Sequence, residues 1–378
     1  MKKIKLFSLA AVAMLSLAGI VSCGGGDEPT PGPDDPTLET VRVGLHTNYG
    51  AGAGYSALNQ GFMKDEGINM VPTTGAGPAL ATSLVEGNLD VSFMGGGVAY
   101  HYFATNPKVK IVALDNLTDD DRLMANPSGP GKDLTTSSSL AEIGNAMKGA
   151  RVALDFNQTP ATFLSTLLTA INEELPAGQQ LWYTNSTGDK LPAGLSSYSA
   201  GCEFQAIQAD NQSLATSASS YDFCIAYAPA ATLIEQRGAM KVVCKTSTHF
   251  ADSYSPSTWA VNVDWLNSHE ETFKKFMRGL VKGMNFRRDH QAECAEDIEE
   301  VTSGSVSADT LATDIAVWLG DKEQIELDQS GNMKKYTENI RQGQLSGQNK
   351  DLCDPNTTVD KASDFSYLLD ACKAILAE

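Results

Sequence analysis

The sequence has no second long apolar segment and few basic residues. Beyond Val21, no run approaches the roughly 20 apolar residues that a membrane-spanning helix needs. The 378 residues include 28 Lys and Arg against 46 Asp and Glu, so the formal net charge is −18. An acidic surface repels the phosphates of nucleic acids and of anionic lipids. We therefore expect a soluble mature body that has no nucleic-acid partner.

Motifs of common catalytic and metal sites are also missing. The cysteines and the five histidines show neither a CxxC pair nor a zinc-binding spacing, and G-x-S-x-G and H-E-x-x-H do not occur. The glycine loop that ends at Gly54 spells G-x-G-x-G rather than the dinucleotide-binding G-x-G-x-x-G, and no acidic residue ends the next strand at Thr73-Thr74. We expect no catalytic residue, no metal and no cofactor, and therefore no enzyme.

Residues 1–22 have the composition of a secretory signal peptide. Three lysines precede an apolar run from Leu6 to Val21, and the small residue Ser22 follows it. Removal of this segment would change the net charge from −18 to −21. Residues 23–38 are rich in Gly, Pro and Asp and hold no apolar residue before Leu38, so they predict a flexible tether.

The end of the signal carries a resemblance of its own. Ile20-Val21-Ser22-Cys23 resembles the lipobox of bacterial lipoproteins, in which the cysteine is acylated and becomes the first mature residue. The resemblance implies that Cys23 carries palmitate-type acyl chains. The protein would then be exported and anchored to a bacterial membrane, facing the periplasm or the cell surface. An ordinary cleaved signal with a chance cysteine is the alternative.

Six cysteines remain beyond Cys23, and an even number in an exported chain permits disulfides. We favour a local bridge between Cys353 and Cys372 near the C-terminus. The alternative is that most of the six are buried thiols.

Short strand patterns alternate with helical patterns from Val41 onward. Strands are predicted over 41–46, 68–74, 89–94 and 109–117, with a helix over 55–66 and a glycine turn over 75–78 that leads into a helix ending at Glu86. The same order starts again with a strand over 151–156 and a helix over 161–175 that Thr159 would cap, followed by strands over 181–185, 222–228, 240–245 and 258–263. Strands separated by helices indicate βαβ units and mostly parallel sheets, here in two lobes.

The segment beyond the last predicted strand is helical in pattern. Ser268 and Glu271 form a capping-box signature at the start of a long helix. Lys274, Arg278 and Lys282 recur on one face of that helix, opposite an apolar stripe. A solvated face is the simpler interpretation of the basic stripe, and docking to an acidic permease loop is the alternative.

Two segments resemble a family of transport proteins. Gly75-Ala76-Gly77-Pro78-Ala79-Leu80, followed by Leu84-Val85-Glu86-Gly87-Asn88-Leu89-Asp90-Val91-Ser92-Phe93, resembles the solute-binding proteins for nitrate, taurine, aliphatic sulfonates and thiamine precursors. Residues 81–84 depart from the usual Glu-Ala-Leu of that motif. Met147–Ala153 and Asp222–Pro229 resemble the same family more weakly. The resemblance covers about residues 41–290.

The resemblance implies a two-lobed type II periplasmic-binding-protein fold with mixed, mostly parallel sheets, flanking helices and a ligand cleft between the lobes. Lobe 1 would comprise residues 39–125 and return over 251–378 with the C-terminal helices, and lobe 2 would comprise residues 126–250. The two crossings would fall near Arg122–Asn126 and Thr246–Thr258. We expect a monomer that works with an ABC permease.

Ligand-binding residues are expected beyond the carboxyl ends of the strands, where glycine turns and helix N-termini present N–H donors. After the first strand we expect His46, Asn48 and Tyr49 to contribute, and in lobe 2 we expect Asn157, Gln158 and Thr159. The remaining candidates are glycine turns and two aromatic residues near strand ends: Gly75, Ala76, Gly77, Gly95, Gly96, Tyr227 and Trp259.

These features predict a lipid-anchored protein that delivers a small solute to an ABC importer by closing its lobes. The glycine turns favour a sulfonate-like anion, whereas the aromatic strand ends favour a heteroaromatic vitamin precursor. A sensory or surface lipoprotein without a permease, and an enzyme on the same fold, are the alternatives.

Overall fold

The computed structural model describes residues 38–118, 121–192, 194–250, 255–315, 318 and 359–378. The signal peptide, almost all of the tether, Cys23 and Cys353 lie outside these residues, so the acylation and the Cys353–Cys372 bridge stay predictions. No helix of the described segments is both long and apolar enough to cross a membrane.

The first sheet has the strand order β2-β1-β3-β12-β4. β1, β2 and β3 run parallel, whereas β12 is antiparallel to both β3 and β4. The five strands are β1 (Glu39–Leu45), β2 (Ile68–Thr74), β3 (Val91–Gly95), β4 (Val109–Thr118) and β12 (Ser255–Asn262).

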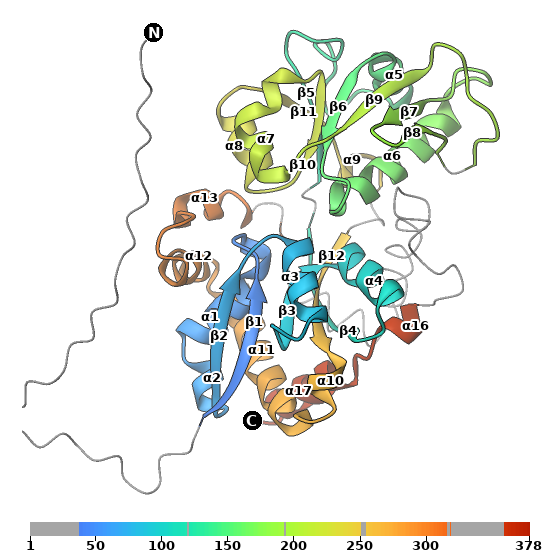
Figure 1. Cartoon of the computed structure of the whole chain (residues 1–378). Helices are drawn as coiled ribbons and strands as arrows, with labels where there is room; N and C mark the ends of the chain where they lie inside the picture. The colour runs from blue at the N-terminus through green and yellow to red at the C-terminus, as the bar shows by residue number, and fades with distance from the viewer. Residues whose placement is uncertain (1–37, 119–120, 193, 251–254, 316–317, 319–358) are drawn as a thin grey trace, which may run out of the picture. The chain divides into compact units, whose positions relative to one another are not determined.

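Helices from the beginning and the end of the chain accompany this sheet (Figure 1). They are η1 (Tyr49–Ala51), α1 (Gly52–Asn59), α2 (Phe62–Asp65), α3 (Gly77–Val85), α4 (Gly96–Thr105), α10 (Val263–Leu266), α11 (Glu270–Asp289), α12 (Gln291–Val301), α13 (Ala308–Ala312), α16 (Val359–Ala362) and α17 (Ser366–Leu376).

The second sheet has the strand order β11-β5-β10-β6-β9-β7-β8. Its strands are β5 (Arg122–Ala125), β6 (Arg151–Leu154), β7 (Trp182–Asn185), β8 (Gly188–Lys190), β9 (Glu203–Gln208), β10 (Phe223–Ala226) and β11 (Lys241–Lys245). The accompanying helices are α5 (Leu140–Met147), α6 (Thr159–Glu174), α7 (Asn211–Ser217), η2 (Ala218–Ser220), α8 (Ala230–Gln236) and α9 (Thr246–His249).

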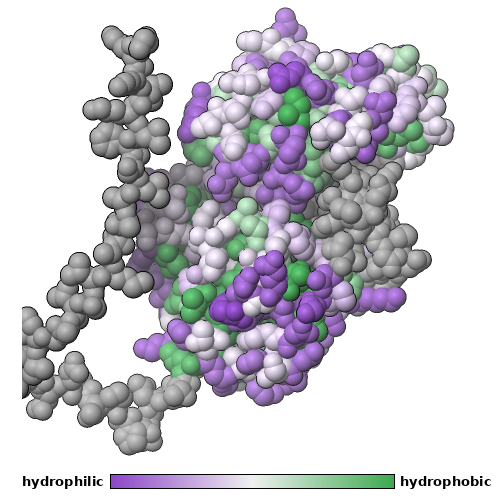
Figure 2. Space-filling view, in the orientation of Figure 1, coloured by the Kyte–Doolittle hydropathy of each residue, from purple (hydrophilic) through white to green (hydrophobic). Residues whose placement is uncertain are grey.

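Each sheet has its own hydrophobic core. Trp259, Phe276 and Leu45 belong to the core of the first sheet, whereas Phe223 and Leu167 belong to that of the second. Figure 2 shows polar residues over much of the visible surface, with apolar patches between them. The two sheets and their separate cores define the two lobes of an α/β fold, as the sequence predicts.

The position of the first crossing differs from the sequence-based prediction. Arg122–Ala125 is strand β5 of the second sheet, antiparallel to both β10 and β11. All four residues of this strand are buried, so their backbone groups need strand partners. The chain therefore passes from the first sheet to the second before Arg122, between β4 and β5, rather than at Arg122–Asn126.

Two predicted helix caps were wrong. Gln158, not Thr159, is the N-cap of α6, and Thr159 is the first helical residue. Ser268 does not cap the long helix α11, because His269 occupies the N-cap and the Ser268 hydroxyl donates to the Trp265 carbonyl instead. In that case the turn that ends α10 competes successfully for the serine hydroxyl.

Candidate functional site

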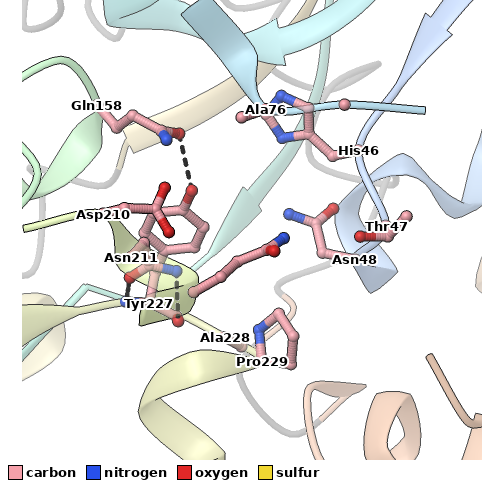
Figure 3. A pocket seen from close by; sticks show the side chains of 12 residues that line it. His46, Thr47, Asn48, Ala76, Gln158, Asp210, Asn211, Tyr227, Ala228 and Pro229 are labelled. Carbon is pink, nitrogen blue, oxygen red and sulfur yellow. Dashed lines mark hydrogen bonds between the residues drawn. The ribbon is translucent and has the colours of Figure 1, made fainter. Parts of the chain in front are cut away.

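A polar cavity of about 30 Å³ lies where strands of the two sheets end (Figure 3). It is lined from the first sheet by the residues after β1 and β2, and from the second sheet by the residues after β6, β9 and β10. Twelve residues line it: His46, Thr47, Asn48, Gly75, Ala76, Gln158, Asp210, Asn211, Gln212, Tyr227, Ala228 and Pro229. The carboxyl ends of strands are the usual ligand-binding edge of α/β sheets.

Helix N-termini of both lobes meet at this cavity. Ala76 is the N-cap of α3 and Gln158 is the N-cap of the sixteen-residue α6. The first backbone N–H groups of a helix have no partner within the helix, and the helix dipole adds partial positive charge there. These two helices therefore favour a ligand that carries negative charge or strong hydrogen-bond acceptors.

Gln158 is held in one orientation by its neighbours. Its Nε2 donates to Asp155 Oδ2 at 3.1 Å, and its Oε1 accepts from the Tyr227 hydroxyl at 2.7 Å. Because a carboxylate only accepts, the Asp155 contact assigns the amide nitrogen of Gln158 to that side. Asp155 Oδ1 is fixed in turn by Gln208 Nε2 at 3.0 Å. The amide face that lines the cavity is thus preset before a ligand binds.

Tyr227 is fixed through its backbone as well. Asn211 Oδ1 accepts from the Tyr227 N–H at 3.1 Å, and Asn211 Nδ2 donates to the Tyr227 carbonyl at 3.3 Å. Both bonds are drawn in Figure 3. Asp210 beside them caps α7 by accepting from the Ser213 N–H at 3.0 Å. Asn211 therefore positions the Tyr227 ring against the cavity.

Among the residues that line the cavity, His46 has a buried side-chain nitrogen, Nε2, without a hydrogen-bond partner. Its side chain is 9% exposed, and Nε2 has no hydrogen-bond partner in the described structure. Burial lowers the pKa of His46 to about 4, so the ring is neutral at neutral pH. A buried polar atom without a partner costs about 1–3 kcal/mol, which a ligand that hydrogen-bonds to Nε2 would recover.

Gly77 keeps the space in front of this nitrogen open. A Cβ atom at residue 77 would lie 3.3 Å from His46 Nε2 and 3.7 Å from Gln158 Oε1. Any side chain at that position would thus crowd the two groups that face the cavity from opposite lobes.

Six of the residues expected to bind ligand line the cavity: His46, Asn48, Gly75, Ala76, Gln158 and Tyr227. Gly95 and Thr159 are not among the lining residues, but they lie where the two lobes touch, since a Cβ at residue 95 would be 3.3 Å from Thr159 Cγ2. Thr159 itself donates to Asp121 Oδ1 at 2.9 Å. Asn157 is exposed and Gly96 is buried, and neither lines the cavity.

Two aromatic candidates lie in the core of lobe 1 instead. Trp259 is fully buried in the middle of β12, and its indole N–H donates to Asp115 Oδ2 at 2.7 Å. Tyr49 is 2% exposed and packs edge-on against Trp318. Both rings therefore pack in the core of lobe 1 and do not line the cavity, contrary to the expectation.

Six lining residues were not expected. Thr47, Ala228 and Pro229 are neighbours in sequence of expected residues, whereas Asp210, Asn211 and Gln212 follow β9, a strand that was not predicted. The available signal was the alternation of polar residues with Phe204 and Ala206, which the structure buries.

No protein-family model matches the chain, and no curated protein matches it either. Several solved structures match the chain in fold. The periplasmic nitrate-binding protein NrtA of Synechocystis PCC 6803 is 13% identical, with a TM-score of 0.66 over 91% of this chain and 90% of its own. A putative periplasmic sulfonate-binding protein of Methylobacillus flagellatus KT is 16% identical, with a TM-score of 0.58 over 90% of this chain and 96% of its own.

An enzyme shares the architecture too. The desulfurization enzyme DSZB is 10% identical, with a TM-score of 0.58 over 89% of this chain and 99% of its own. Likeness at this level of identity establishes the fold and leaves the activity open. The chain has the two-lobed α/β fold of the periplasmic solute-binding proteins.

Proposed function

We propose that the chain is a solute-binding protein that captures a small polar solute between its lobes and delivers it to an ABC importer. The observation that carries this proposal is the buried, unpartnered Nε2 of His46, which faces the preset amide of Gln158 across a cavity lined by both lobes. A ligand that contacts both groups is bound best when the lobes are closed, so it favours the closed form.

Binding rather than catalysis suits the chemistry of the lining. Asp210, the carboxylate of the lining, is engaged in capping α7 through the Ser213 N–H and hydroxyl. The described cysteines are not among the lining residues, and burial raises the pKa of the Cys224 thiol to about 12. A thiol with a raised pKa is a poor nucleophile.

The lining is compatible with two classes of headgroup in the solute. The N-termini of α3 and α6 support a sulfonate-like anion. The Tyr227 ring supports a heteroaromatic group such as a thiamine-type pyrimidine. Both classes would use hydrogen bonds to His46 and Gln158.

A thermal-shift screen of the purified full chain tests the proposal. The panel comprises nitrate, bicarbonate, taurine, alkyl sulfonates and thiamine-type pyrimidines. A ligand at 100 times its Kd stabilises the folded state by about 2.7 kcal/mol, which raises Tm by several degrees. The His46→Asn variant serves as the control and should lose the shift. Equal shifts in both proteins would contradict binding at this site.

We also propose that Cys23 is acylated and anchors the protein to the membrane after export. The lipobox-like sequence before Cys23 supports this. Cells fed a clickable palmitate analogue should label the wild-type protein, and the Cys23→Ser variant should be unlabelled. Persistent labelling of that variant would place the lipid elsewhere.

A further inference from the structure

A second cavity, of about 560 Å³, adjoins the first. The two share the lining residues Thr47, Gly75, Ala76, Asp210, Gln212 and Pro229. The inner cavity of about 30 Å³ holds roughly two water molecules, because one water needs at least about 10–15 Å³. The outer cavity lies within the range of about 300–1,000 Å³ that is typical of sites for organic ligands.

The outer cavity is bounded by elements of both lobes. On one side lie Ala215 of α7 and Leu233 of α8, and on the other lie Val306 and Thr310 at the start of α13. Val306 packs against the core of lobe 1, and the Ser307 hydroxyl caps α13 by accepting from the Thr310 N–H at 3.2 Å. The wall contributed by the C-terminal segment is therefore anchored to its own lobe.

A buried contact joins the two walls. The hydroxyl of Thr232 on α8 donates to Asp314 Oδ1 at 3.2 Å, and these residues are 7% and 4% exposed. Since Thr232 lies next to Leu233 and Asp314 follows α13, this bond keeps the two walls in register. The outer cavity is thus a built feature of the arrangement in which the lobes contact each other.

The lining of the outer cavity is chemically mixed. Leu233, Val306 and Ala215 offer aliphatic surface, whereas Thr74 and Thr310 offer hydroxyls. Asp210, on the rim that the two cavities share, is the charged residue of both linings. At the inner cavity the N-termini of α3 and α6 offset this negative charge, whereas the further residues that line the outer cavity add no cationic side chain, so the outer cavity suits an uncharged body with an aliphatic portion.

We propose that the solute is bipartite, with a compact polar head in the inner cavity at His46 and Gln158 and an uncharged aliphatic body in the outer cavity against Leu233 and Val306. This inference rests on the proposed function and narrows it. A bare inorganic anion would leave the outer cavity without a ligand and is not the main solute.

Matched pairs of compounds test the inference by isothermal titration calorimetry of the purified full chain. One pair is methanesulfonate and 1-hexanesulfonate, and the other is acetamide and heptanamide, because the heads of both pairs are compact. Within the pair whose head is accepted, the longer compound should bind at least about tenfold more tightly, because additional methylenes are buried. Equal affinity within that pair would overturn the inference and leave the proposed function intact.

Variants locate the body of the ligand. Leu233→Trp fills the outer cavity and should abolish the advantage of the longer compound without changing the affinity for the shorter one. Gln236→Trp, at an exposed position of the same helix that does not line the cavity, is the matched control. Ala215→Trp repeats the test from α7 if Leu233→Trp lowers Tm.

The remaining outcomes are also decisive. If Leu233→Trp weakens the short and the long compound equally, the body does not occupy the outer cavity and the inference fails. If none of the four compounds binds the wild-type protein, the inference fails, whereas the proposed function is decided separately by the thermal-shift panel.

Discussion

The hydroxyl of Tyr227 donates to Gln158 Oε1 at 2.7 Å, and this bond joins the chain after β10 to the N-cap of α6. Gln158 donates in turn to Asp155, so the three side chains form a chain of hydrogen bonds along one wall of the inner cavity. Such a chain holds each group in one orientation, which reduces the ordering that a ligand has to impose on binding.

Replacing Gln158 by leucine should weaken ligand binding by tenfold or more, since both hydrogen bonds of the amide are lost. It should also destabilise the fold by about 1–3 kcal/mol, because Asp155 Oδ2 loses its donor. Calorimetry and urea denaturation measure the two effects separately. The control, Asn157→Ala, alters an exposed neighbour outside the lining and should change neither quantity.

His46 should make stability depend on pH. Burial lowers its pKa from 6.5 to about 4, so between these values the unfolded state binds a proton that the folded state does not. The contribution of neutral His46 to the free energy of unfolding is fully present above pH 6.5 and is lost as the pH falls toward 4. From pH 7 to pH 5 the loss should be about 2 kcal/mol.

Urea denaturation at pH 7 and pH 5 measures this loss. His46→Gln should remove that part of the pH dependence, whereas replacement of the exposed His269 should leave it in place. If the free energy of unfolding of His46→Gln changes with pH as much as that of the wild-type protein, the ring is not neutral in the folded protein.

Arg287→Met should destabilise lobe 1 by about 3–5 kcal/mol, because it leaves the buried carboxylate of Asp115 without its charge partner. Arg287 also donates to the Gly50 carbonyl at 2.5 Å, so the variant should loosen the loop that carries Asn48 and weaken ligand binding. Arg288→Met removes a neighbouring arginine whose partner, Asp289, is largely exposed, and it is the matched control. Comparable losses in both variants would contradict this role.

Two members of the basic stripe on α11 are neutralised within the molecule. Arg278 and Lys282 each contact a different oxygen of Glu66 at 2.7 Å. Burial opposes a lowered pKa at Glu66, but hydrogen bonds from Lys282 and Arg278 outweigh it and lower the pKa. These contacts give Arg278 and Lys282 an internal role and weaken the permease-docking interpretation.

Arg278→Glu should therefore destabilise the fold by about 1 kcal/mol, because it sets a second carboxylate against Glu66. Lys274→Glu is the matched control, because its neighbours Glu270 and Glu271 are largely exposed and solvent screens the added repulsion, whereas Glu66 is 10% exposed. It should have little effect on thermal unfolding. If instead all three charge reversals abolish transport without changing Tm, the docking interpretation is favoured.

Elements with a strong local pattern were predictable. Ile68–Thr74 forms a strand with the predicted bounds, and α3 starts at the Gly77-Pro78 turn, where proline is favoured in the first turn of a helix. The strand Glu203–Gln208 alternates between buried and exposed residues but is short and lies between polar loops, so it was not predicted. As a consequence Asp210, Asn211 and Gln212 were missing from the expected site.

Trp259 was expected to contact the ligand, but the structure buries it in the core. The strand that contains it begins at Ser255, earlier than predicted, so the tryptophan lies in the middle of β12 and not at its end. Pairing with both β3 and β4 buries this segment. An aromatic residue in a strand looks the same in sequence whether its ring faces a core or a cleft.

The sequence by itself determined the alternation of strands and helices, the two-lobed α/β class and the presence of polar residues after several strands, because these depend on short-range periodicity. Only the tertiary structure decided which strand ends meet, that His46 faces Gln158, and that the C-terminal residues around Val306 form a wall of the outer cavity. Strand order and lobe contact arise from pairing between residues far apart in the chain, and no local pattern encodes that choice.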